Sequence, residues 1–281
     1  MLEPGLSMES GSAWTDEHAA AARQAHERLF DGLPAATAYQ LSADGSSMLG
    51  LPRVSPSLDL TYGDVPFDAL AGALRHAALQ RGGYFYDLGS GVARGVLCAA
   101  LLCGEAHCIG IELLQGLHDA ACEPVRRFRA LQRTGALQPT AGDADAAAHA
   151  LSASNLAASV DLRCGDLFSL DLRHPPAGGV DVVVFVCCVT WSAPILERLA
   201  VKLSDELADG ARVLTVGKRL PEFVDLGVAR GGARFDEAWR GVATFEWGCE
   251  PLVLQRVVHV GELTARRLRK KQLRTARSLP T

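Results

Sequence analysis

The clearest chemical pattern in the sequence is a glycine turn followed by acidic residues at the ends of apolar segments. The turn is Asp87-Leu88-Gly89-Ser90-Gly91, where glycine brings backbone N–H groups close to a ligand. Glu112 lies twenty-five residues after Asp87, where a carboxylate can accept hydrogen bonds from both hydroxyls of a ribose. Asp166, followed by Leu167 and Phe168, can accept the exocyclic amine of a purine whose ring lies against those apolar side chains. These residues predict a site for a nucleoside.

The glycine pattern does not fit a dinucleotide, because the third glycine of G-x-G-x-x-G is replaced by Arg94. An acid, a glycine turn and two further acids at the ends of successive strands are instead typical of class I methyltransferases that bind S-adenosylmethionine (SAM). We therefore expect SAM as the cofactor and no metal. The expected cofactor-binding residues from this pattern are Asp87, Gly89, Ser90, Gly91, Glu112, Asp166, Leu167 and Phe168.

An open α/β sheet would bring these residues together. The expected strands cover residues 84–91, 107–113, 160–166, 180–188 and 211–218, with a closing pair at 243–248 and 250–260. Helical patterns between them cover 92–104, 116–135 with a bend or break at Pro124, and 193–210. Helical crossovers imply a mostly parallel sheet with helices on both faces, whereas the closing pair is too close in sequence for a crossover and should be antiparallel. Ligands bind beyond the carboxyl ends of such strands.

The chain divides into three parts by composition. Residues 1–60 form a lead-in, with a helix starting after Thr15 and a loop rich in Ser, Gly and Pro over 33–60. Residues 61–261 form the α/β domain, which includes an alanine-rich insertion at 135–158. Residues 262–281 form a basic tail.

The net charge is unevenly distributed. The 281-residue chain carries −4 overall, but residues 262–281 hold seven basic residues and one acid, so the remainder carries −10. A body with that charge would be repelled by phosphate and attracted to a basic protein surface. The tail, over residues 264–278, is a candidate contact for nucleic acid or a nuclear-import signal.

The cysteines and the N-terminus indicate an intracellular protein. The eight cysteines form no C-x-x-C pair and no Cys/His set at zinc spacing, so we expect reduced thiols among apolar residues. The N-terminus lacks the pattern of a secretory signal, and no apolar run is long enough to span a membrane.

Several motifs in this order point to a family. Tyr62-Gly63-Asp64-Val65-Pro66-Phe67-Asp68 precedes the first expected strand, and Gly165-Asp166-Leu167-Phe168 follows the third. Phe245-Glu246-Trp247-Gly248 precedes the last strand. Together with the turn at 87–92, these segments resemble the disruptor-of-telomeric-silencing (Dot-one) family of histone H3 core-lysine methyltransferases over about residues 60–260. The resemblance implies the Rossmann-like fold of class I methyltransferases and a nuclear, chromatin-directed activity on nucleosomal histone H3.

The resemblance also implies roles for particular residues. Tyr62 and Asp64 would belong to the loop that closes over SAM, and Trp247 would help to wall a lysine channel. The end of the fourth strand, where the family carries Asn-Asn-Phe, reads Cys187-Cys188-Val189-Thr190-Trp191. We expect this segment to form the floor of the acceptor site, so the expected catalytic residues are Tyr62, Cys187, Thr190, Trp191 and Trp247.

The change from the asparagine pair leaves the acceptor open. The first hypothesis is a protein-lysine methyltransferase of the Dot-one type. The second is a SAM methyltransferase that acts on a small molecule or on a non-histone protein. The third is a catalytically silent module with a SAM-binding fold that docks on chromatin through its basic tail. The order of motifs favours the first.

Overall fold

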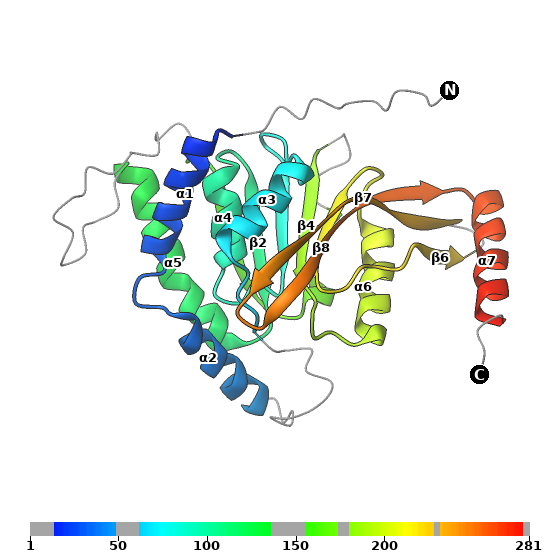
Figure 1. The fold of residues 1–281 in the computed structure, drawn as a ribbon, viewed down its shortest axis with the longest axis horizontal. Coiled ribbons are helices and arrows are strands. Elements are labelled where there is room, and N and C mark those ends of the chain that lie inside the picture. Colours follow the sequence, from blue (N-terminus) through cyan, green and yellow to red (C-terminus); the bar gives the residue numbers. More distant parts are fainter. Residues whose placement is uncertain (1–13, 49–61, 136–155, 174–179, 228–230, 278–281) are drawn as a thin grey trace.

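The fold is an eight-stranded sheet with helices on both faces (Figure 1), as a computed structural model describes it for residues 14–48, 62–135, 156–173, 180–227 and 231–277. The strand order is β3-β2-β1-β4-β5-β8-β7-β6. Strands β1 to β5 are parallel, and β8, β7 and β6 continue the sheet in antiparallel fashion. The prediction of a mostly parallel α/β sheet with an antiparallel C-terminal part is confirmed.

The strands and helices of the α/β domain occur in the expected order along the chain. The strands are β1 Tyr84–Leu88, β2 His107–Glu112, β3 Ser159–Cys164, β4 Val182–Cys187, β5 Arg212–Val216, β6 Phe223–Gly227, β7 Gly231–Phe245 and β8 Gly248–Val260. The helices are α1 Asp16–Leu29, α2 Ala35–Met48, α3 Phe67–Ala77, α4 Arg94–Leu102, α5 Gln115–Thr134, α6 Ala193–Glu206 and α7 Glu262–Arg277. Helix α5 continues through Pro124, and most of the expected insertion at 135–158 lies outside the described residues.

The central strands are apolar at consecutive positions because both of their faces are buried. In β4, Val183 and Phe185 face the core beneath α1, α3, α4 and α5, whereas Val182, Val184 and Val186 face the core beneath α6. This two-sided burial explains the uninterrupted run VVVFVC, which is typical of a strand in the middle of a parallel sheet.

The C-terminal strands differ from the expectation in number and length. β7 begins at Gly231 rather than near residue 243, and β6 adds a third antiparallel strand that we did not predict. Exposed and half-buried residues alternate along much of β7. An edge region with one solvated face carries a weaker hydrophobic signal than a buried strand, and for that reason it was missed.

The expected loop at 33–60 is partly wrong, because α2 occupies residues 35–48. Its Ser- and Gly-rich sequence has low helix propensity. Packing stabilises it: Ala38 is buried, and a Cβ on Gly45 would lie 3.2 Å from Leu114, just before α5. Tertiary contact with the cofactor-binding part of the chain therefore outweighs local propensity.

Within the described residues, no helix is long and apolar enough to cross a membrane. All eight cysteines fall in this part of the chain, and each carries a free thiol. Cys98, Cys103, Cys108 and Cys188 are buried, whereas Cys122, Cys164 and Cys249 are exposed.

Candidate cofactor and acceptor site

A cavity of about 290 Å³ opens at the carboxyl ends of β1, β2 and β4. The strand order reverses between β1 and β4, and such a switch point is where ligands bind in open α/β sheets. The structure brings all ten expected cofactor-binding residues to the lining of this one cavity: Tyr62, Asp64, Asp87, Gly89, Ser90, Gly91, Glu112, Asp166, Leu167 and Phe168.

The turn between β1 and α4 is built for close approach. Gly91 has φ +53°, and a Cβ on it would lie 2.5 Å from the ring of Tyr62. Ala93, two residues further on, also has a left-handed φ of 70°, which costs an L-residue about 1 kcal/mol or more. The turn therefore keeps a left-handed backbone even at a residue that is not glycine.

Glu112 connects this turn to the end of β2. One carboxylate oxygen accepts the backbone N–H of Gly91 at 2.8 Å, and the other accepts that of Leu114 at 2.8 Å. Burial raises the pKa of Glu112, and the two N–H donors oppose that shift. Each carboxylate oxygen has a further lone pair for a ribose hydroxyl.

Asp87 is a second buried acid beside the turn. Burial first, and then the charge of Glu112, raise its pKa to about 8. A Cβ on Gly95 would lie 2.4 Å from Oδ2 of Asp87, so α4 approaches this carboxylate as closely as a glycine allows. Two adjacent buried acids favour a ligand that brings positive charge, as the ammonium and sulfonium groups of SAM do.

Arg94 and Asp64, which also line the cavity, form an ion pair with 3.2 Å between Nε and Oδ2. The guanidinium lies 4.3 Å from the ring centroid of Phe30 and donates to the Leu33 carbonyl at 2.9 Å. Nε2 of His26 donates to the Arg94 carbonyl at 3.0 Å, and burial lowers the His26 pKa to about 4, so the ring is neutral. The N-terminal helix α1 thus fixes the first residue of α4.

The loop that carries Tyr62 is held by α2. The backbone N–H of Tyr62 donates to Ser42 Oγ at 3.1 Å, and the ring meets Tyr39 edge-on at 5.4 Å between centroids. Burial raises the Tyr62 pKa far above its ordinary value, so its hydroxyl stays protonated beside Asp64. The residues expected to close over the cofactor are therefore ordered by the lead-in.

The acceptor side of the cavity contains only some of the expected catalytic residues. Tyr62, Cys187 and Trp191 line it, and the Trp191 ring lies 3.7 Å from a Cβ placed on Gly89. Trp247 does not line the cavity, but it lies against Gly63, which does. Thr190 is not among the lining residues.

Two charged lining residues were missed from the sequence, Arg94 and Arg198. Arg94 had a signal: a cation at the first position of a helix opposes the helix dipole and needs a compensating partner. For Arg198 the sequence gives no such signal, because only the packing of α6 decides which residues of that helix face the cavity. No group of three potential metal ligands occurs among the described residues.

We expect Glu112→Ala to weaken binding of S-adenosylhomocysteine by about tenfold to a hundredfold, the loss associated with a charged hydrogen bond of about 1.5–3 kcal/mol. Calorimetric titration would measure the dissociation constant. Glu123→Ala, which removes an exposed carboxylate from α5, is the matched control and should bind as the wild type does. An affinity within about threefold of wild type in Glu112→Ala would contradict the ribose assignment.

The raised pKa of Asp87 predicts a pH dependence of stability. An unfolded aspartate titrates near about 3.9, so between about pH 4 and pH 8 the folded protein binds more protons than the unfolded chain. The free energy of unfolding should therefore fall as pH rises through that window. Asp87→Asn cannot titrate and should show a smaller fall, measured by urea unfolding near both ends of the window. An identical fall in wild type and variant would show that another group is responsible.

Comparison with known proteins finds one family whose sequence model matches part of this chain. The sequence model of the family described as histone methylation protein DOT1 matches residues 51–135, which include the Tyr62 loop, the glycine turn and Glu112. A search of curated protein sequences finds no significant match.

Solved structures with a similar fold are distant in sequence. An RNA methyltransferase from Salinibacter ruber in complex with S-adenosylhomocysteine is 17% identical, with 69% of this chain and 94% of that chain covered and a TM-score of 0.44. TrmN from Thermus thermophilus is 17% identical, with 68% and 49% covered and a TM-score of 0.40. Geranyl diphosphate C-methyltransferase from Streptomyces coelicolor A3(2) is 14% identical, with 53% and 44% covered and a TM-score of 0.36.

The resemblance stated from the motifs is thus confirmed over residues 51–135. The strand order, the glycine turn and the acids that end β1 and β2 agree with it. The chain is a SAM-dependent methyltransferase with the class I fold, and its cofactor-binding segment matches the DOT1 histone methylation family.

Proposed function

We propose that this methyltransferase acts on a lysine side chain of a protein, with histone H3 in the nucleosome as the acceptor. The observation that carries the proposal is the match of residues 51–135 to the DOT1 histone methylation family. The matched segment includes Tyr62 to Asp64, the loop that lies over Gly91 at the mouth of the cavity. A nuclear location would follow from a nucleosomal acceptor.

The acceptor side of the cavity suits a lysine. Phe185, Cys187, Trp191 and Tyr62 give it an aromatic and apolar lining. An amine that enters such surroundings has a lowered pKa, because burial disfavours the charged form. Aromatic faces also stabilise a methylated ammonium product. The wall therefore favours both the neutral nucleophile and the cationic product.

When bound, SAM supplies an electrophilic methyl group on a sulfonium. The chain has to hold an amine about 3 Å from that methyl, in line with the bond that breaks. Trp191 packs beside Gly89 and Tyr62 packs on Gly91, so the two rings limit the approach to the cavity. Cys187 acts as a neutral part of the wall, because burial raises the pKa of its thiol to about 12.

Charge on the acceptor side supports a basic partner. Burial raises the pKa of Asp64, and the nearby charge of Glu246 adds to that rise, whereas Arg94 opposes it. The chain before residue 262 carries −10 in total. A negative surface of this kind attracts a positively charged histone and steers its encounter with the site.

The acceptor is tested by transfer of tritiated methyl from SAM to nucleosomes, free histones and a cell extract. We expect label on nucleosomal H3, abolished when its core lysines are replaced by arginine. Trp191→Ala should lower the transfer rate more than tenfold, whereas Trp191→Phe should retain most of it. Label only in small molecules would reject the lysine acceptor in favour of the second hypothesis. Binding of S-adenosylhomocysteine without any transfer would favour a silent module.

We further propose that the basic tail contacts nucleic acid as a helix. Helix α7 lies at the far end of the molecule from α1 and α5 (Figure 1). Arg269 anchors it through an ion pair with Asp225 of β6 at 2.5 Å, and Ala265 is buried. Arg269 also pairs with Glu262 within the helix, at 3.1 Å. Arg266, Arg267, Lys270 and Lys271 remain exposed on the same helix. These four side chains are placed to meet phosphates.

Replacing Arg267, Lys270 and Lys271 by alanine leaves the Arg269 anchor in place. The variant should show a shallower dependence of nucleosome affinity on salt, by about 0.9 in the log–log slope for each phosphate that the helix no longer neutralises. The control replaces Arg81, Arg126 and Arg163, three exposed arginines outside α7, and so removes the same net charge. Equal slopes for the α7 variant and the wild type would reject the contact.

A further inference from the structure

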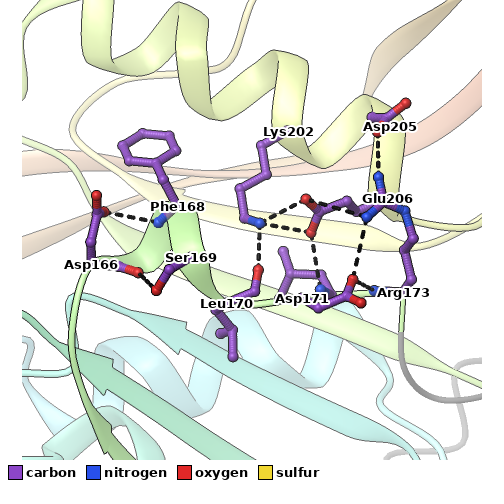
Figure 2. Close-up of polar contacts among 10 residues, drawn as sticks. Asp166, Phe168, Ser169, Leu170, Asp171, Arg173, Lys202, Asp205 and Glu206 are labelled. Carbon is purple, nitrogen blue, oxygen red and sulfur yellow. Dashed lines mark hydrogen bonds and ion pairs between the residues drawn. The ribbon is translucent and has the colours of Figure 1, made fainter.

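Helix α6 presents one side chain per turn to the segment expected to bind the purine. Arg198, Lys202 and Glu206 are four residues apart, so they lie on one face of the helix at steps of about 6 Å. They contact Phe168, Leu170 and Leu172 in turn, and Figure 2 shows the polar contacts of Lys202 and Glu206 with the segment between Asp166 and Arg173.

Each of the three contacts has a defined geometry. The Arg198 guanidinium lies 3.7 Å from the ring centroid of Phe168. Nζ of Lys202 donates to the Leu170 carbonyl and pairs with both carboxylate oxygens of Glu206, at 2.7 and 2.8 Å. The backbone N–H of Leu172 donates to Glu206 at 3.0 Å. The set Arg198, Lys202 and Glu206 is called the α6 stripe below.

The α6 stripe fixes the position of a segment that apolar packing alone would leave less defined. The Lys202 and Glu206 side chains are only 7% and 12% exposed, so both charges are nearly removed from water. Leu170 and Leu172 pack in the same core as Leu199 and Leu203 of α6. Apolar contacts have no preferred direction, whereas the two hydrogen bonds to the backbone set the register of the segment along the helix.

Hydrogen bonds connect Asp166 to the residues that precede Leu170. Oδ1 of Asp166 accepts the backbone N–H of Phe168 at 2.9 Å, and Ser169 Oγ donates to the Asp166 carbonyl at 2.7 Å. These bonds close a single turn of 3₁₀ helix over Leu167–Ser169. The position of Leu170 therefore determines where the Asp166 carboxylate and the Phe168 ring lie in the cavity.

We propose that Lys202 and Glu206 of the α6 stripe determine the purine specificity of the cofactor site, and that Arg198 adds to its affinity for either purine. Arg198 lines the cavity and extends the wall formed by Phe168, so it would touch a cofactor bound there. Lys202 and Glu206 do not line the cavity and act as positioning residues, because they hold Asp166 where it accepts the exocyclic amine of adenine. The proposal rests on SAM binding and is independent of the methyl acceptor.

The test compares two ligands that differ at the purine amine. S-Adenosylhomocysteine carries the amine, and S-inosylhomocysteine carries a carbonyl oxygen in its place. Calorimetry on the full chain should give a preference for the adenine ligand of about tenfold or more, the value of a charged hydrogen bond. Replacing both Lys202 and Glu206 by methionine fills a similar volume with apolar side chains and leaves no unpaired buried charge, so the protein should still fold. We expect this double variant to lose most of the preference.

Three further variants separate positioning from general stability. Glu206→Gln keeps an oxygen that can accept the backbone N–H of Leu172. It should retain at least half of the preference for the adenine ligand on a logarithmic scale. This single variant can be measured even if the double variant does not fold. Arg198→Ala should weaken both ligands by the same factor, about two- to fivefold, because it removes wall contact rather than amine recognition. Glu197→Gln, at an exposed position of α6, is the control and should change neither affinity.

The outcomes distinguish this proposal from the proposed function. A wild-type preference in a folded double variant would overturn the role of Lys202 and Glu206, whatever the acceptor is. Failure of the wild type to bind either ligand would overturn the stripe together with the cofactor assignment. Methyl transfer to an acceptor other than histone would leave the inference standing, because the binding experiment contains no acceptor.

Discussion

The hydrogen bonds of the Glu112 carboxylate are the interaction on which the rest of the cavity depends. They join the turn after β1, through Gly91, to the turn after β2, through Leu114. A buried carboxylate is costly unless it is hydrogen-bonded, so the two N–H donors make its burial possible. Because Gly91 has no side chain, the Tyr62 ring can lie on the same turn. Two strand ends and the loop over the cavity are thereby held in one arrangement.

Two buried acids favour a cationic cofactor in the cavity. Asp87 and Glu112 are both buried, and the charge of Glu112 makes ionisation of Asp87 less favourable. A ligand with ammonium and sulfonium charges relieves that repulsion, whereas a dinucleotide phosphate would add to it. Asp64 and Arg94, which line the same cavity, place one charge of each sign side by side. The site is thus suited to a nucleoside that also carries an amino-acid group.

The walls of the site come from elements outside the central strands and their nearest helices. Helix α1 fixes Arg94 through His26 and Phe30, and α2 fixes Tyr62 through Ser42 and Tyr39. On the opposite face of the sheet, α6 fixes the segment around Phe168. The N-terminal segment expected to be a simple lead-in is therefore part of the site. Its weak helical sequence is stabilised by the packing that also orders the cofactor loop.

The sequence by itself determined the parallel strands, the order of motifs and eight of the residues that line the cofactor cavity, and the family resemblance added Tyr62 and Asp64. Those features follow from local patterns: apolar runs buried on both faces, glycines at a left-handed turn, and acids at strand ends. Helix α2, strand β6, the contacts of Arg94 and the direction in which Arg198 points were decided only by the tertiary structure. Thr190 and Trp247 were expected at the acceptor site, yet only Trp247 reaches its border. In all these cases the outcome depends on contacts between residues far apart in sequence, and local propensity and spacing carry no information about such contacts.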